Sequence, residues 1–250
     1  MTTYFSAGRL ALVAASLVLA FGTAAHAQAG ATAWKAAKIY VPAGLAAGGA
    51  DCESDIAGKC ATGIKPGKHP VIVFLHGCGG PRSTRTFVGL GAIVVAPNSF
   101  AGGASCKADP AAIAKLLTER YADVAFAAGQ LKAAGWADPE KLVLAGYSNG
   151  AQTTATYAGE EFKARVIVAW TCNNARAPSQ NGVKGNGPAL AVLGTADEFY
   201  KKIGLSGDCG AALANRAGSR SILIKGGSHE ILDHAETRAA VAAFVPGAIK

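Results

Sequence analysis

The sequence predicts an α/β protein with a doubly wound, mostly parallel sheet covered by helices on both faces, which is a three-layer sandwich. Short aliphatic runs recur along the chain, longer helical stretches separate them, and several runs end at Gly or Pro. Runs that are apolar throughout are typical of strands buried on both faces. Strands that alternate with helices join into such a sheet through right-handed crossovers.

The expected strands are rich in Val, Ile and Leu. They are VIVFLHG (71–77), AIVVAP (92–97), KLVLAG (141–146), RVIVAW (165–170), ALAVLG (189–194) and SILIKG (221–226). An additional strand, KIYVP (38–42), is expected at the edge of the sheet.

Three segments between the strands predict helices. Residues 109–135 open on an Asp cap with Pro in the first turn and close on Gly135. Residues 149–162 follow a serine directly, and residues 230–245 carry apolar residues at helical spacing and end before a proline. Residues 43–69 are Gly-rich and polar, so we expect an irregular excursion there and not a separate domain.

Residues 1–27 have the order of a secretory signal peptide. Arg9 is the only charge before a long apolar run, and small residues at 25 and 27 follow as a cleavage site. A transmembrane anchor is the alternative, but the apolar run is short of the roughly 20 residues that span a bilayer. We therefore expect one domain over residues 28–250, periplasmic or secreted, with no membrane anchor after cleavage.

The charge distribution argues against nucleic-acid binding. The chain carries a formal net charge of +8, but its basic residues are scattered and form no Lys/Arg run. A nucleic-acid interface would gather them on one element, interleaved with aromatic residues. We expect no nucleic-acid partner.

All six cysteines lie in the expected domain. An even number in an exported chain favours disulfides. Neither C-x-x-C pairs nor Cys/His clusters with zinc-like spacing occur, so no metal site is expected. The pairing is open from sequence alone, and we expect the sequential one: Cys52–Cys60, Cys78–Cys106 and Cys172–Cys209. A free Cys78 would be an alternative nucleophile.

Ser148 lies in the pattern G-x-S-x-G, between Gly146 and Gly150, where an apolar run passes into a helical segment. This pattern at a strand-to-helix transition is typical of a nucleophile elbow, whose tight turn projects the serine hydroxyl above the sheet edge. The helix that follows directs its free N–H groups at the same spot. An ordinary Gly-rich turn is the alternative.

A serine hydroxyl needs a base to remove its proton. His229 lies in a Gly-rich loop after the last strand, from which it can reach Ser148, and we expect it to be that base. Among the other candidates, His69 precedes a strand at the opposite end of the sheet, His76 is expected to be structural, and His234 falls inside a predicted helix.

The imidazole needs a carboxylate to hold its tautomer. Asp197, in LGTADEF after a strand, is the expected acid, with Glu198 and Asp208 as alternatives. The tetrahedral intermediate also needs donors for its oxyanion. We expect them to be the backbone N–H groups of Asn149 and, in the HGCGG loop, Cys78.

Four motifs, FLHGCGG, GYSNG, GTADE and GSHE, resemble in their order and intervals the α/β-hydrolase fold. The chain is similar to exported members of the dienelactone hydrolase family over residues 65–245, including the stretch GLGAIVVAPNSFAGGASC. The LHGC loop is also similar to that of polyhydroxyalkanoate depolymerases and feruloyl esterases. The resemblance implies a Ser148–Asp197–His229 triad that acts on carboxylic esters or lactones without a cofactor. Dienelactone hydrolases proper have a cysteine nucleophile, so the serine favours a general esterase.

We therefore expect a serine hydrolase that cleaves small-molecule or polymeric esters through an acyl-enzyme on Ser148. One alternative keeps the mechanism and changes the substrate to a peptide, as in the related oligopeptidases. The other is a ligand-binding protein on a catalytically silent scaffold of the same fold.

Overall fold

The computed structural model describes residues 27–81, 85–106, 109–173, 181–202, 204–205 and 207–250. The expected signal peptide lies outside these ranges apart from residue 27. Within them the chain forms an eight-stranded sheet in the order β2-β1-β4-β3-β5-β6-β7-β8. Strands β3 to β8 run parallel, and β1 pairs antiparallel with both β2 and β4.

Every strand except β2 corresponds to a strand that the sequence predicts. The strands are β1 Lys38–Val41, β2 Cys52–Asp55, β3 His69–Leu75, β4 Ile93–Ala96, β5 Ala137–Tyr147, β6 Ala164–Val168, β7 Ala189–Gly194 and β8 Arg220–Ile224. The order of the parallel strands requires crossover connections, because β3 lies between β4 and β5.

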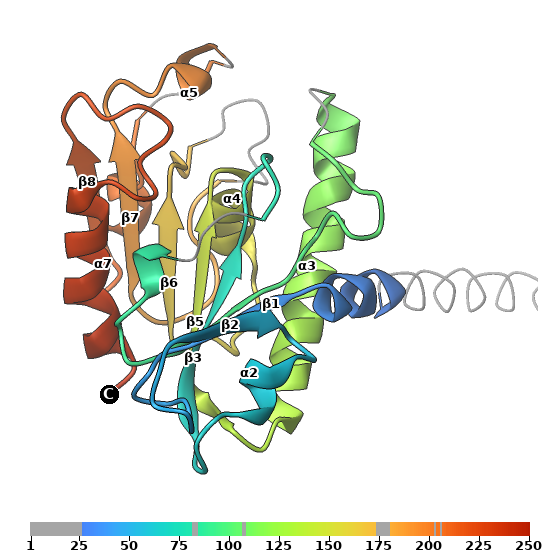
Figure 1. Cartoon of the computed structure of the whole chain (residues 1–250). Helices are drawn as coiled ribbons and strands as arrows, with labels where there is room; N and C mark the ends of the chain where they lie inside the picture. Colours follow the sequence, from blue (N-terminus) through green and yellow to red (C-terminus); the bar gives the residue numbers. More distant parts are fainter. Residues whose placement is uncertain (1–26, 82–84, 107–108, 174–180, 203, 206) are drawn as a thin grey trace, which may run out of the picture.

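Helices cover both faces of the sheet. They are a helix over 27–35, α2 Lys59–Thr62, α3 Pro110–Ala133, α4 Asn149–Thr156, α5 Glu198–Lys202, α6 Gly210–Leu213, α7 Ala235–Ala248 and the short 3-10 helix η1 Arg85–Phe87. Figure 1 shows α3 and α7 on opposite sides of the strands. The predicted three-layer sandwich is confirmed.

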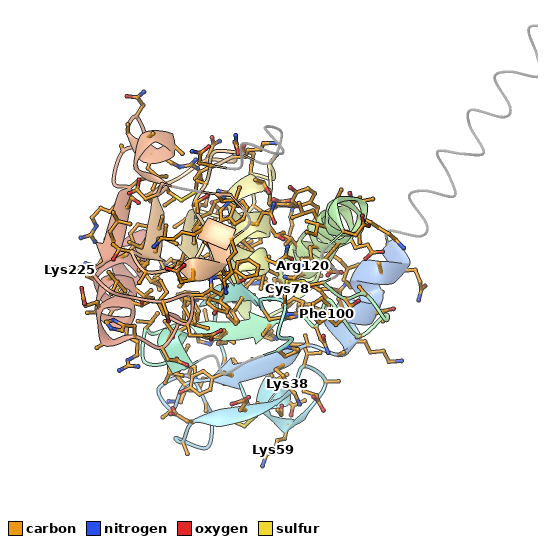
Figure 2. The ribbon with its side chains drawn as sticks, turned by 90° about the horizontal axis from the view of Figure 1, so that it is seen from above. Lys38, Lys59, Cys78, Phe100, Arg120 and Lys225 are labelled. Carbon is orange, nitrogen blue, oxygen red and sulfur yellow. A yellow bond between two sulfur atoms is a disulfide. The ribbon has the colours of Figure 1, made fainter. Side chains whose placement is uncertain are left out.

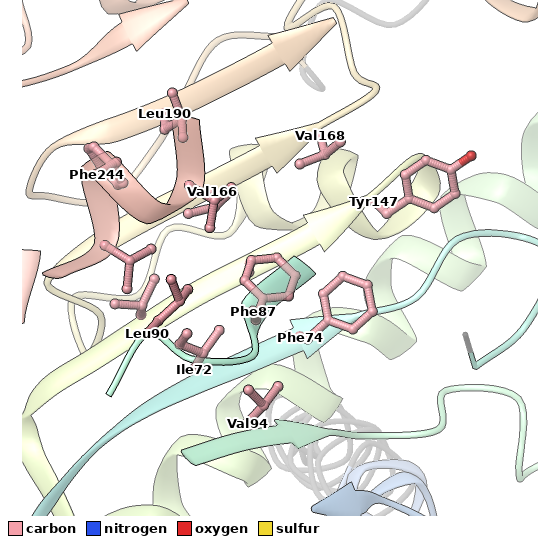
Figure 3. Close-up of a cluster of buried hydrophobic side chains, with 14 of the residues drawn as sticks. Ile72, Phe74, Phe87, Leu90, Val94, Tyr147, Val166, Val168, Leu190 and Phe244 are labelled. Atoms are coloured by element: carbon pink, nitrogen blue, oxygen red, sulfur yellow. The ribbon is translucent and has the colours of Figure 1, made fainter. Parts of the chain in front are cut away.

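Successive residues of each central strand enter different cores. On β3, Ile72 and Phe74 belong to the cluster under α7 (Figure 3), whereas Val71 and Val73 belong to the cluster under α3. Both faces are therefore apolar, which explains why the runs in the sequence do not alternate with polar residues. Tyr147 lies at the end of the first cluster, next to the rim of the sheet.

The prediction that residues 38–42 form the edge of the sheet is wrong. The strand β1 is an inner strand, because β2 pairs outside it from Val41↔Cys52 to Lys38↔Asp55. The excursion over 43–69 is therefore partly regular, since it supplies β2 and α2. A short polar strand such as β2 has one exposed face and no apolar run, so its sequence carries no strong signal.

Two predicted helices have different bounds in the structure. Helix α4 ends at Thr156 and not at 162. Beyond its end the buried guanidinium of Arg165 donates hydrogen bonds to the carbonyls of Tyr157 and Gly159, at 3.2 and 3.0 Å. Helix α7 begins after His234, not at 230, and continues through Pro246 to Ala248. The residues before it form a turn, in which His234 N–H donates to the carbonyl of Ile231 at 3.1 Å, and Pro246 lies inside the helix.

Three disulfides join the cysteines in the expected sequential order: Cys52–Cys60, Cys78–Cys106 and Cys172–Cys209. All six cysteines of the chain are thereby bonded, so a free Cys78 nucleophile is excluded. Within the described ranges no helix is both long enough and apolar enough to span a membrane.

Candidate active site

The three residues of the expected triad follow three different strands of the parallel sheet. Ser148 follows β5, Asp197 follows β7 and His229 follows β8. The arrowheads of the parallel strands point to one end of the molecule, where α5 also lies (Figure 1). Loops at the carboxyl ends of parallel strands share one rim, so side chains far apart in sequence can meet there.

The turn at Ser148 has the strained backbone of a nucleophile elbow. Its φ is +57° and its ψ −121°, a conformation that residues with a Cβ rarely adopt. A Cβ at Gly146 would overlap the carbonyl of Gly150, and a Cβ at Gly150 would overlap the carbonyl of Leu75. The two glycines thus allow β5, β3 and α4 to approach closely enough to hold the turn.

Hydrogen bonds join the three side chains in a row. The imidazole Nε2 of His229 lies 2.9 Å from Oγ of Ser148, and its Nδ1 lies 2.8 Å from Oδ2 of Asp197. A carboxylate only accepts, so Nδ1 carries the hydrogen and Nε2 is free to accept one from the serine. Asp197 is buried, and its Oδ1 accepts from the backbone N–H groups of Phe199 and Tyr200.

Aromatic rings surround the imidazole of His229. The ring centroids of Tyr147, Phe199 and Tyr200 lie 5.5, 4.9 and 5.2 Å from it. Tyr147 also donates to the His229 carbonyl at 3.2 Å, and Tyr200 donates to the carbonyl of Ala169. Burial, together with the charge of Asp197, raises the pKa of Tyr200 well above its usual range, so the phenol stays a donor. Sequence reasoning missed these rings, although each adjoins a motif, in GYSNG and ADEFY.

The two expected oxyanion donors belong to segments that lie next to Ser148. Asn149 is the first residue of α4, where a helix leaves its N–H groups without intrahelical acceptors. Cys78 lies in the loop after β3, next to Gly77, and a Cβ at Gly77 would lie 3.1 Å from Cβ of Ser148. The described part of the chain gives neither N–H group a backbone acceptor.

A buried charged cluster lies behind this loop. It contains Arg120 and Asp123 of α3 together with His76, with the ring of Phe100 against them (Figure 2). Burial lowers the pKa of Arg120 to about 10 and raises that of Asp123 to about 6. Sequence reasoning missed Arg120. The feature of the sequence that could have indicated it is the charged pair Arg120 and Asp123, three residues apart on a helix that packs on the sheet.

The alternative candidates lie in other surroundings. His69 donates from Nε2 to the carbonyl of Lys65 at the opposite end of β3, and His234 caps α7 by accepting from Glu236 N–H. Glu198 is exposed and pairs with Lys201. The carboxylate of Asp208 instead accepts from the hydroxyl of Ser221 and the N–H of Gly210. Over the described ranges no three His, Cys, Asp or Glu side chains gather as a metal site.

Residues 56–207 match the model of the dienelactone hydrolase family. Among solved structures, similar chains include a candidate dienelactone hydrolase from Klebsiella pneumoniae subsp. pneumoniae (16% identity, 72% of this chain and 88% of that chain, TM-score 0.54). Others are a phospholipase/carboxylesterase from Dyadobacter fermentans (18%, 71% and 90%, 0.51) and a hyperthermophilic esterase from Pyrobaculum calidifontis (16%, 75% and 80%, 0.50). The likeness shows the α/β-hydrolase fold. The search of curated proteins found no match.

Proposed function

Because the chain belongs to the dienelactone hydrolase family, whose members are hydrolases of ester type, we propose that it is a serine esterase that cleaves carboxylic esters or lactones through an acyl-enzyme on Ser148. The observation that carries this proposal is the row of hydrogen bonds from Ser148 through His229 to Asp197, at 2.9 and 2.8 Å. Nucleophile, base and orienting acid are thus all within hydrogen-bond reach, as nucleophilic catalysis requires.

The first half-reaction forms the acyl-enzyme. Nε2 of His229 takes the hydroxyl proton while Oγ of Ser148 bonds to the ester carbonyl carbon, and the carbonyl oxygen becomes an oxyanion. The N–H groups of Asn149 and Cys78 donate to that oxyanion. As the carbonyl re-forms, the bond to the alcohol oxygen breaks, and the imidazolium protonates the departing alcohol.

The second half-reaction releases the acid. A water molecule loses a proton to Nε2 of His229 and attacks the acyl carbon, and the same two N–H groups hold the second oxyanion. Collapse breaks the bond to Oγ of Ser148, which takes its proton back from the imidazolium. The carboxylate of Asp197 stabilises the imidazolium in each half-reaction. The net reaction is ester plus water to acid plus alcohol.

The compartment and the substrate size belong to the same proposal. Three disulfides favour an oxidising environment. Together with the signal-peptide pattern of residues 1–27, they support a periplasmic or secreted enzyme. Its substrate would be a small-molecule or polymeric ester, with no nucleic-acid partner.

Covalent labelling tests the proposed nucleophile. A fluorophosphonate probe is expected to form one adduct, which mass spectrometry of peptides locates on Ser148, and to abolish hydrolysis of p-nitrophenyl acetate in proportion. Hydrolysis of peptide anilides in place of esters would favour the peptidase alternative. A folded protein that neither labels nor hydrolyses any ester would be a silent binding scaffold, and the proposal would be wrong.

The disulfide beside the proposed oxyanion loop is expected to affect both stability and rate. Replacing Cys78 and Cys106 together with alanine should lower the free energy of unfolding by about 3.5 kcal/mol, because the bond closes a loop of 28 residues. It should also lower kcat about tenfold, because the N–H donor of Cys78 is less firmly held. Urea unfolding and initial-rate kinetics measure the two effects.

The disulfide Cys52–Cys60 provides the matched control. It lies between β2 and α2, away from the rim, and spans only 8 residues. Replacing both cysteines with alanine should cost about 2.5 kcal/mol and leave kcat within about twofold. Equal losses of kcat in the two double variants would argue against a role for the Cys78 loop in the reaction.

A further inference from the structure

We infer that Arg120 and His76 are positioning residues for the oxyanion hole: they fix two successive carbonyls of the loop after β3, so that the N–H of Cys78 faces Ser148. This inference rests on the proposed function and deepens it. Neither side chain reaches the substrate in the mechanism above. Arg120 would act through the peptide group between His76 and Gly77, and His76 through the next one, between Gly77 and Cys78.

Arg120 reaches the loop from α3. Its side chain is completely buried, and its Nη1 donates to the carbonyl of His76 at 2.7 Å. The guanidinium carbon lies 5.4 Å from the centre of the Phe100 ring, and Figure 2 labels both residues in the same part of the view as Cys78. Asp123, one turn further along α3, supplies the nearby negative charge. Burying the charge of Arg120 costs free energy, and its hydrogen bond to the His76 carbonyl offsets part of that cost.

His76 fixes the next carbonyl. Its Nδ1 lies 2.7 Å from the carbonyl oxygen of Gly77, which can only accept, so Nδ1 carries the hydrogen. Burial, with a contribution from Arg120, lowers the pKa of His76 to about 4, so the imidazole is neutral at physiological pH. The imidazole also packs edge-on against the ring of Phe100, with the two ring centroids 4.6 Å apart. The loop is thus held by a neutral donor, the His76 imidazole, which itself packs against Phe100.

The carbonyl of Gly77 determines where the N–H of Cys78 points. It accepts a second hydrogen bond from Gly80 N–H at 3.2 Å, so its direction is set by two donors. The peptide bond is trans, and in a trans peptide the N–H points opposite to the C=O. The N–H of Cys78 therefore points away from the His76 imidazole. Ser148 lies close to this peptide group, because a Cβ added at Gly77 would lie 3.1 Å from Cβ of Ser148, and our inference places the serine on the N–H side.

A donor held in this way stabilises the transition state more than the bound substrate. Negative charge on the substrate oxygen develops during the attack, and a donor already in place needs no rearrangement at that moment. If Arg120 or His76 is removed, the peptide group can rotate and the N–H of Cys78 is lost to the oxyanion part of the time. The expected consequence is a lower kcat with an unchanged KM.

The experiment compares variants at the two positions by the response to an altered substrate. Arg120→Met and His76→Leu remove the donors, whereas His76→Asn keeps an N–H group near the Gly77 carbonyl. Each variant is assayed on an ester and on its thionoester, in which sulfur, a poorer acceptor, replaces the carbonyl oxygen. We expect kcat for the ester to fall by about 10- to 100-fold in the first two variants, with KM within about twofold.

The ratio of ester to thionoester rates is the readout that a merely structural role would not move. It should fall about tenfold in Arg120→Met and His76→Leu, because the lost hydrogen bond matters mostly for oxygen, and it should be largely restored in His76→Asn. If Arg120→Met does not fold, as judged by circular dichroism, the pair of His76 variants decides the question.

Arg165→Met is the matched control. Arg165 is also completely buried, and among the described residues it donates to the main-chain carbonyls of Tyr157, Gly159 and Asn186. It should lose stability but keep the ratio of ester to thionoester rates. If this variant does not fold, Arg216→Met, which frees the carbonyl of Val183, replaces it.

The outcomes separate this inference from the proposed function. An unchanged kcat and rate ratio in Arg120→Met and His76→Leu, or an equal change in the control, would overturn the inference while the esterase proposal stands. A wild-type chain that hydrolyses no ester and takes up no fluorophosphonate would overturn the proposed function itself, and with it this inference.

Discussion

Replacing Ser148 with alanine is expected to lower kcat/KM for ester hydrolysis by about 10⁴- to 10⁶-fold. The acyl-enzyme cannot form without the hydroxyl, and the remaining rate would come from a water molecule held beside the two oxyanion donors. The protein itself should stay folded. Alanine keeps the Cβ that Ser148 already carries at its φ of +57°, so the substitution adds no backbone strain.

Initial rates with p-nitrophenyl esters, together with thermal unfolding, check this expectation. Ser221→Ala is the control, because that serine also donates a side-chain hydrogen bond, in its case to the carboxylate of Asp208 at 2.8 Å, but lies on β8 away from the rim. Its rate should stay within about twofold of the wild type. Should Ser148→Ala retain a tenth or more of the activity, another nucleophile would have to be sought.

Replacing Gly150 with alanine is expected to lower the free energy of unfolding by about 3 kcal/mol. The added methyl group would overlap the carbonyl of Leu75 and lie 2.7 Å from that of His76. These are main-chain atoms of β3 and of the loop after it, and neither can move aside as a flexible side chain could. Activity should fall as well, because the same shift displaces the proposed oxyanion loop.

Replacing Gly129 with alanine should change the free energy of unfolding in the opposite direction. Gly129 lies inside α3, is exposed, and has no atom within 4 Å of an added Cβ. Alanine should therefore raise the free energy of unfolding by about 0.5 to 1 kcal/mol, because glycine is a poor helix former. Urea unfolding of both variants measures the difference. A Gly150→Ala protein as stable as the wild type would contradict the close approach of α4 to β3.

The sequence predicted the parts of the fold that depend on burial of neighbouring residues. The run ALAVLG was predicted as a strand and forms β7 with the same bounds. Four to seven apolar residues between turn residues predict a strand locally, and this prediction does not depend on the order of the strands in the sheet. The strand β2 was missed because its residues alternate between partly buried and exposed, and it pairs with β1 across a glycine-rich loop.

Helix ends were less predictable than helix existence. Helix α4 ends at Thr156, three residues before Gly159, and Arg165 on the next strand donates to the carbonyls of Tyr157 and Gly159 beyond that end. The start of α7 depends likewise on where Ile231 and Leu232 enter the core. Tertiary contacts of this kind outweigh helix propensities, which differ by less than about 1 kcal/mol per residue.

The sequence by itself determined the strands that consist of apolar runs, the elbow around Ser148, and the types of side chain that follow the strands, because each depends on a few neighbouring residues. Only the tertiary structure decided which loops meet. It brought Asp197 and His229 to within hydrogen-bond distance of each other and of the serine, packed aromatic rings around the imidazole, and joined Arg120 to a carbonyl 44 residues away in the chain. The physical reason is that the order of strands in the sheet sets these neighbours, and that order follows from packing of the whole core.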